Sequence, residues 1–127
     1  MWRVPLFVGV VFLSGCLMHH ASNGDVVDRT VITEAELDSV HAGSALEAIS
    51  MLRPMFLMTR GKLSVDPTVP AALPNIYVDN QFYGDATVLR NISASTIESI
   101  KFYSASEAQF KFGRGNEAGV IGIFTKH

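Results

Sequence analysis

The last third of this sequence limits the possible folds more than any other stretch. Strand-forming, helix-forming and turn-forming residues follow one another there over a short distance. The pattern predicts a strand at Ser99–Tyr103, a short capped helix at Ser104–Phe112, a glycine-rich turn at Gly113–Gly119 and a closing strand at Val120–Thr125. The sequence around Ser104 and Glu107 is a capping box, which favours a helix beginning there. We therefore expect an α/β (α+β) domain, with a small mixed sheet and two to four short helices packed on it.

The middle of the chain adds further short elements. We expect, in chain order, a strand at Thr30–Thr33, a helix from Thr33 to about His41, a helix at Ala45–Arg53, a strand at Met55–Met58, a hairpin or bent strand at Asn75–Phe82 and a helix at Ala86–Asn91. Gly43 should break the first helix, and Pro54 should end the second because proline disfavours helical backbone at the preceding residue. Asp79-Asn80 suits a turn with positive φ at Asn80.

Alternation of side chains along one strand predicts which of them enter the core. The expected inward positions are Ile97, Ile100 and Phe102. The positions expected to face outward or towards an edge are Glu98, Lys101 and Tyr103. One face of the sheet should therefore be strongly apolar.

The beginning of the chain follows a different pattern. After Arg3, Val4–Leu13 is a mostly apolar run that is too short to cross a bilayer as a helix but has the length of a signal-peptide core. It ends in Leu13-Ser14-Gly15-Cys16, which resembles the bacterial lipobox. In a lipobox, small residues precede the cysteine whose sulfur takes up lipid before cleavage in front of it. This resemblance predicts lipidation of Cys16.

Three regions are therefore expected: a lipoprotein signal peptide at residues 1–15, a flexible tether at 16–29 and a folded domain at 30–127. More than one acyl chain on the lipidated cysteine would give stable anchoring. The alternatives are an ordinary cleaved signal peptide and an uncleaved anchor. The residue after Cys16 is Leu17. By resemblance to enterobacterial sorting signals, an aspartate at this position would favour the inner membrane. The outer membrane is therefore the expected location.

Charge and loop composition narrow the kinds of partner. Without Arg3, nine Lys and Arg stand against twelve Asp and Glu, so the net charge is −3. No nucleic-acid partner is expected, because such partners need a basic surface. The glycine-rich turn runs from a helix into a strand, which is the wrong order for a phosphate-binding loop. Candidate contact loops are this turn, Lys62–Pro74 and Asp79–Gly84, although they could equally be solvated loops without a partner.

No set of residues predicts catalysis or metal binding. The four histidines are His19, His20, His41 and His127, and three of them lie near the ends of the sequence. Cys16, the single cysteine, is assigned to lipid, so Ser–His–acid and Cys–His arrangements lack support. Met51, Met55 and Met58 are expected to fill the core rather than to bind copper. We therefore expect no enzyme activity, no metal and no cofactor.

The motifs in their order resemble the plug domain of TonB-dependent outer-membrane receptors. The residues that carry the resemblance are Ala45-Leu46, Arg60-Gly61, the strand–turn Ile76-Tyr77-Val78-Asp79-Asn80, the strand Ile97–Phe102, Phe112-Gly113 and the closing motif Ala118–Lys126. Together they cover roughly Val31–Lys126. Asn80 departs from the glycine usual in that turn, and Ser104–Glu107 replaces a common Gly-Pro segment. No barrel of about 22 strands follows, so we do not expect a transporter by itself.

The resemblance implies a lipid-anchored binding or interaction module, expected at the periplasmic face of the outer membrane. Its expected partners are the membrane, through lipid on Cys16, and an outer-membrane barrel or another envelope protein. The candidate interaction residues are Arg60, Asp79, Asn80, Arg114 and Asn116. The alternative is a structural envelope scaffold derived from a receptor plug, with no ligand.

Overall fold

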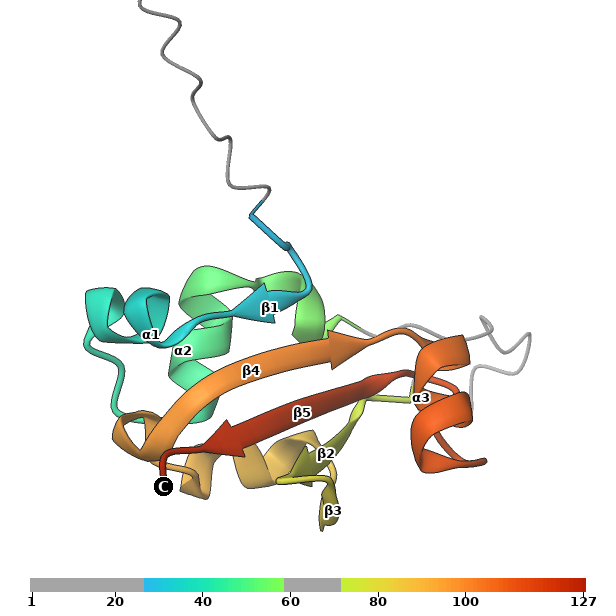
Figure 1. Cartoon of the computed structure of the whole chain (residues 1–127). Helices are drawn as coiled ribbons and strands as arrows, with labels where there is room; N and C mark the ends of the chain where they lie inside the picture. The colour runs from blue at the N-terminus through green and yellow to red at the C-terminus, as the bar shows by residue number, and fades with distance from the viewer. Residues whose placement is uncertain (1–26, 59–71) are drawn as a thin grey trace, which may run out of the picture.

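A computed structural model describes residues 27–58 and 72–127, which form a five-stranded sheet with short helices packed on it (Figure 1). The strands are β1 (Val31–Ile32), β2 (Asn75–Val78), β3 (Gln81–Gly84), β4 (Ile97–Tyr103) and β5 (Val120–Thr125). Their order across the sheet is β1-β4-β5-β2-β3. Only β2 and β5 pair in parallel, and the other neighbours are antiparallel. The expected α+β class with a small mixed sheet is confirmed.

The helices are short and begin where the sequence supplies a cap. They are α1 (Glu34–Val40), α2 (Ala45–Leu52) and α3 (Ala105–Phe112), with the 3-10 helices η1 (Pro54–Leu57), η2 (Ala86–Asn91) and η3 (Ala94–Thr96). Thr33 and Ser104 form complete capping boxes at α1 and α3. Ser44 caps α2, but the Glu47 carboxylate accepts a hydrogen bond from the Gly43 amide at 2.9 Å, so this box is only half formed. Caps matter in helices this short, because few of their backbone groups have a partner within the helix.

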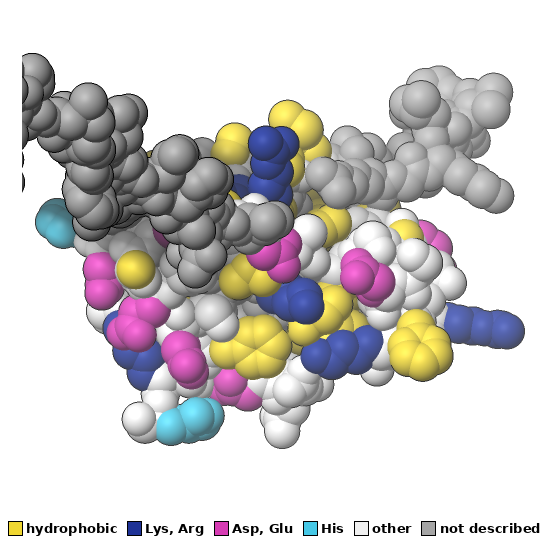
Figure 2. Space-filling view, turned by 45° about the horizontal axis from the view of Figure 1, so that its top comes forward, with side chains coloured by type: hydrophobic (Ala, Val, Ile, Leu, Met, Phe, Trp, Pro, Cys, Tyr) yellow, Lys and Arg dark blue, Asp and Glu magenta, His cyan; other side chains and the backbone are white. Residues whose placement is uncertain are grey.

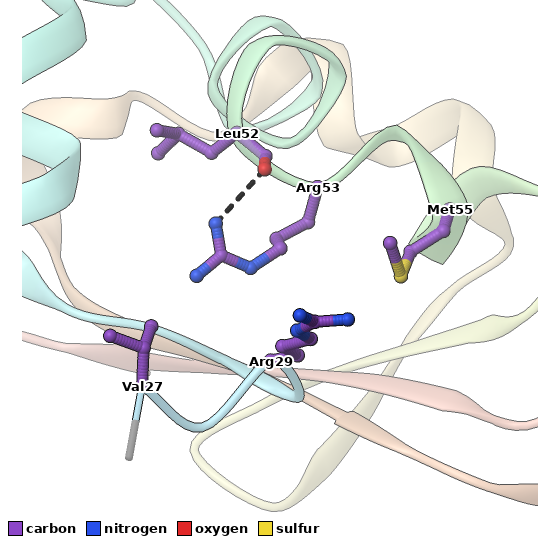
Figure 3. Close-up of a pocket in the computed structure, with 5 residues that line it drawn as sticks. All are labelled: Val27, Arg29, Leu52, Arg53 and Met55. Atoms are coloured by element: carbon purple, nitrogen blue, oxygen red, sulfur yellow. Dashed lines mark hydrogen bonds between the residues drawn. The ribbon is translucent and has the colours of Figure 1, made fainter. Parts of the chain in front are cut away.

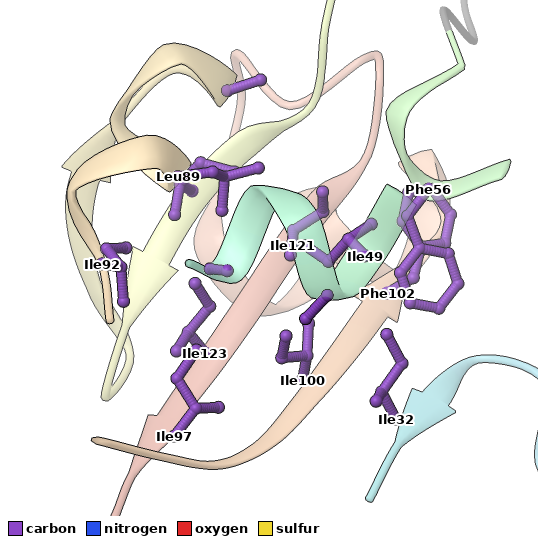
Figure 4. Close-up of a cluster of buried hydrophobic side chains, with 14 of the residues drawn as sticks. Ile32, Ile49, Phe56, Leu89, Ile92, Ile97, Ile100, Phe102, Ile121 and Ile123 are labelled. Carbon is purple, nitrogen blue, oxygen red and sulfur yellow. The ribbon is translucent and has the colours of Figure 1, made fainter. Parts of the chain in front are cut away.

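One face of the sheet carries the main core. In Figure 1, α2 lies behind β4, and α1 lies beside α2 at the left of the view. The side chains of this core that are labelled in Figure 4 are Ile32, Ile49, Phe56, Leu89, Ile92, Ile97, Ile100, Phe102, Ile121 and Ile123. The inward positions expected for β4 are therefore confirmed. Burying one such side chain contributes about 1.5–3 kcal/mol, so this face supplies most of the stability.

The segment after α2 differs from the prediction, because Met55–Met58 was expected to be a strand. Pro54 instead begins η1, since its fixed φ suits the first position of a helical turn. Only Phe56 of this turn reaches the core, where its ring stacks on Phe102 with centroids 5.3 Å apart. The expectation that methionines fill the core is also wrong, because Met51, Met55 and Met58 are all exposed.

The first helix ends close to its predicted end, because Val40 is its last residue. The chain leaves the helix two residues before Gly43, which was expected to break it, at His41 in the left-handed conformation. The His41 ring Nδ1 donates to the Asp38 carbonyl at 2.6 Å, which supports this end. A second expectation needs correction. Tyr103 was expected to face outward or towards an edge, but it is buried on the second face of the sheet, where Ala108 of α3 packs near it.

The hairpin of β2 and β3 confirms the turn prediction. Asp79 and Asn80 both have positive φ, at 48° and 67°. Two positive values in succession are what a tight two-residue hairpin loop requires, and Asp and Asn tolerate them better than most residues. The signal peptide, Arg60, most of the tether and most of Lys62–Pro74 lie outside the described residues.

Candidate functional site

Asp79 and Asn80 lie at the tip of the hairpin, beside the end of β5. The Asp79 carboxylate accepts hydrogen bonds from the Thr125 amide at 3.0 Å and the Thr125 hydroxyl at 2.6 Å. These two bonds, the hydroxyl first, hold the pKa of Asp79 below its usual range. The carboxylate therefore joins the hairpin to β5, while the exposed Asn80 remains available to a partner.

Arg114 and Asn116 lie at the other end of the sheet, because Asn75 pairs with Val120 there whereas Val78 pairs with Ile123 near the hairpin tip. Asn116 is only 2% exposed. Its amide donates to the Gly113 carbonyl and its carbonyl oxygen accepts from the Asn75 amide, both at 2.9 Å. Asn116 therefore holds the glycine-rich turn in place from inside, and Arg114 is the exposed member of the pair.

The five candidate residues therefore do not form one site. Asp79 and Asn80 lie at one end of the sheet, Arg114 and Asn116 lie at the other, and Arg60 lies outside the described residues. The surface between the two ends carries a different set of side chains. We call it the aromatic–lysine face, and it consists of Tyr77, Phe82, Lys101, Tyr103, Lys111, Phe112 and Phe124.

The rings of this face form a continuous row across three strands and a helix. Phe82 of β3 meets Tyr77 of β2 edge-on, with centroids 5.6 Å apart. Tyr77 in turn lies 4.2 Å from the Phe112 ring, at the end of α3. Phe112 then meets Tyr103 of β4 edge-on at 5.3 Å. Such pairs are worth about 0.5–1.5 kcal/mol each beyond their buried area, so they hold α3 on the sheet.

Gly122 of β5 makes room for this row. A Cβ atom added at Gly122 would lie 2.9 Å from Cε2 of Tyr103, which is closer than carbon atoms normally approach. The Tyr103 ring therefore lies over the bare backbone of β5. Any side chain at this position would displace the ring.

Two lysines bring positive charge to the aromatic row. The Lys111 ammonium donates to the Tyr103 hydroxyl at 3.0 Å and lies 4.7 Å from the centre of that ring. Lys101 lies 5.2 Å from the same ring centre. Neither lysine forms an ion pair within residues 27–58 and 72–127. The pKa values of Asp28 and Glu107 are lowered mainly by hydrogen bonds and, to a smaller extent, by the charge of Lys101. Lys101 therefore has acidic side chains near it, and Lys111 is the less compensated charge.

The face becomes more open towards β3. Phe82 is 63% exposed although it ends the aromatic row, and β3 has a strand on only one side among the described residues. In Figure 2, hydrophobic and basic side chains lie together near the centre of the view, and acidic side chains gather towards its left. An apolar, cationic surface beside an open strand edge can bind a partner through rings, charge and backbone.

Sequence reasoning missed this face because its residues come from five separate segments. The signal was present in the alternation of β4 and β5, where Lys101, Tyr103 and Phe124 occupy the positions opposite the core. What the alternation does not show is that α3 covers one end of this face and leaves the other end open.

Within the described ranges, no group of three or more His, Cys, Asp or Glu side chains could hold a metal ion. No helix in the same part of the chain is long and apolar enough to cross a membrane. Comparison with family models, curated proteins and solved structures finds no match to this chain.

Proposed function

We propose that this chain is a lipid-anchored cell-envelope protein whose plug-like domain acts as a binding module at the outer membrane. It would be held through Cys16, at the periplasmic face, and would not transport by itself. The lipobox-like sequence supports the anchor, and the order of plug-like motifs supports the domain. The observation that carries the binding role is the aromatic–lysine face, which leaves Phe82 exposed and Lys111 without an ion pair in the described chain.

The chemistry of this face favours a protein partner, such as an outer-membrane barrel or another envelope protein. Partly exposed rings contribute most when a partner's apolar side chains exclude water from them. Lys111 would then face a carboxylate of the partner in a drier environment, where their attraction is stronger. The net negative charge of the mature chain makes nucleic acid a poor partner.

Crosslinking in intact cells, followed by recovery of the tagged lipoprotein, tests this role. Phe82→Ala should lower the recovery of a specific envelope protein by about tenfold, because a central interface ring is commonly worth 1.4 kcal/mol or more. Tyr83→Ala is the matched control. Tyr83 is 55% exposed and follows Phe82 on β3, so its side chain points to the opposite side of the strand.

Equal recovery with both variants would show that the aromatic–lysine face is not the interface. Arg114→Glu and Asn80→Asp would then test the exposed residues at the two ends of the sheet. If no protein is recovered with the unaltered chain, the scaffold alternative without a ligand is favoured.

The anchor is tested separately by Cys16→Ala. This variant should leave the membrane fraction and should take up no labelled palmitate, because a thioether to lipid requires the cysteine thiol. Membrane association and palmitate uptake that survive the change would contradict the lipid anchor.

A further inference from the structure

A small pocket opens beside β1, away from the aromatic–lysine face. It has a volume of about 320 Å³, and its described lining residues are Val27, Arg29, Leu52, Arg53 and Met55. Figure 3 shows Arg53 entering from the end of α2 and Arg29 from the segment before β1, on opposite sides of the pocket. Its size is at the lower end of the range for small-molecule sites, about 300–1,000 Å³.

Arg53 is held by two contacts, and one of its three nitrogens has no partner among the described residues. Its Nη1 donates to the Leu52 carbonyl at 3.0 Å, and its Nη2 forms an ion pair with Glu36 at 2.8 Å. Its Nε is buried and has no hydrogen-bond partner. A buried N–H without an acceptor is costly, so this end of the pocket favours an acceptor over an apolar group.

Arg29 supplies the second cation. It is exposed and forms no hydrogen bond or ion pair with the described residues. Glu36 is the acid paired with Arg53, and its other carboxylate oxygen accepts from the Thr33 amide at 3.0 Å. Arg53 is therefore already paired with an acid, whereas Arg29 has no acid partner among the described residues, and none of the described lining residues is acidic.

We propose that Arg29 and Arg53 bind a monoanionic oxyanion, a carboxylate or a phosphodiester, that carries a short apolar chain. The single surplus charge matches a monoanion, and guanidinium groups present donors in the planar geometry that such oxygens accept. The apolar part would lie against Val27, Leu52 and Met55. This accounts both for the unpaired Nε of Arg53 and for an exposed methionine at the rim of the pocket.

Either of two sources can supply this chemistry: a free organic acid or the headgroup of an anionic lipid. We would titrate the full 127-residue chain, labelled with ¹⁵N, with octanoate, octanol, dihexanoylphosphatidylglycerol and dihexanoylphosphatidylcholine, each below its micelle concentration. Octanoate and the phosphatidylglycerol provide the monoanion in its two forms. Octanol and the phosphatidylcholine are their matched controls without net charge.

At least one of the two anions should shift the amide signals of Leu52, Arg53 and Met55 in a saturable manner. Its affinity should exceed that of its uncharged control by about tenfold or more, since each charge-assisted hydrogen bond is worth that much. Saturation by octanoate alone assigns the free acid as the source, and saturation by phosphatidylglycerol alone assigns the lipid headgroup. Saturation by both confirms a site for the shared oxyanion.

Arg29→Gln should weaken this binding by about tenfold without changing the fold, because the Arg29 side chain has no partner to lose among the described residues. Arg90→Gln, at an exposed arginine on η2, is the control and should leave the affinity unchanged. Arg53→Gln breaks the Glu36 pair, so it would be used only after its spectrum shows a folded chain. The proposal is overturned if neither anion shifts these signals, if the uncharged controls bind equally well, or if Arg29→Gln and Arg90→Gln behave alike.

Discussion

The two faces of the sheet are built from different side chains and differ in how far helices cover them. The covered face is aliphatic apart from Phe56 and Phe102, and the helices α1 and α2 with η1 and η2 shield it. Among the described elements, only α3 packs on the aromatic–lysine face, where it holds Tyr103 near Ala108 and leaves Phe82 exposed. The two faces share the same strands, so their difference comes from alternate residues of one sequence.

This difference separates stability from recognition. Most isoleucines on the covered face are fully removed from water, so replacing one of them costs packing and leaves a cavity. On the aromatic–lysine face Tyr103 is buried but Phe82 is exposed, so a partner can still remove much of the Phe82 ring from water. Substitutions on the two faces should therefore affect different measurements.

The largest effect is expected on the covered face. Ile100→Ala should lower the free energy of unfolding by about 2–5 kcal/mol, because Ile100 is fully buried between the sheet and the helices. Its neighbour Lys101 points to the aromatic–lysine face, and Lys101→Ala should cost less than about 1 kcal/mol. Urea unfolding of both variants measures the contrast. Equal losses would mean that the two faces contribute alike to stability.

A smaller effect is expected where β5 supports the aromatic row. Gly122→Ala should lower the free energy of unfolding by about 1–3 kcal/mol, since its methyl group must displace the Tyr103 ring. Replacing Tyr103 by valine in the same chain should remove part of this loss, because the shorter side chain does not reach the methyl group. A double-mutant cycle by urea unfolding measures the coupling, and strict additivity would show that the Tyr103 ring is not the obstacle.

The smallest effect concerns the hairpin tip, at the end of both faces. Because the pKa of Asp79 is lowered in the folded state, its stabilisation is present above the unfolded-state pKa of about 3.9 and is lost as the pH falls through the folded-state value. Asp79→Asn preserves the tolerance of positive φ but removes the charge. The variant should be less stable at neutral pH, by under about 1 kcal/mol for so exposed a group, and the gap should shrink in acid.

Urea unfolding between about pH 2 and pH 7 checks this last prediction over the range in which the carboxyl titrates. Glu117→Gln is the control, because Glu117 is also an exposed carboxylate and lies in the turn at the opposite end of the sheet. A gap between Asp79→Asn and the unaltered chain that stays constant with pH would show that the charge on Asp79 does not stabilise the hairpin.

Local sequence was enough to predict the elements that depend on a few neighbouring residues. Thr33 and Ser104 begin helices because their hydroxyls and the glutamates three residues later pair over one turn. Asp79 and Asn80 turn the chain because both tolerate positive φ. The same reasoning failed at Met55–Met58, where an apolar run of four residues suits a strand and a helical turn equally well, and Pro54 decided between them.

Sequence by itself therefore determined the α+β class, most element positions and the inward side of β4, because these follow from spacing along the chain. Only the tertiary structure decided that α3 covers Tyr103 and that Asn116 is buried and bonded to Asn75. It also decided that Arg29 lies across a pocket from Arg53. Each of these depends on segments that are distant in the chain. Their contacts arise from packing of the sheet and helices, which local periodicity does not encode.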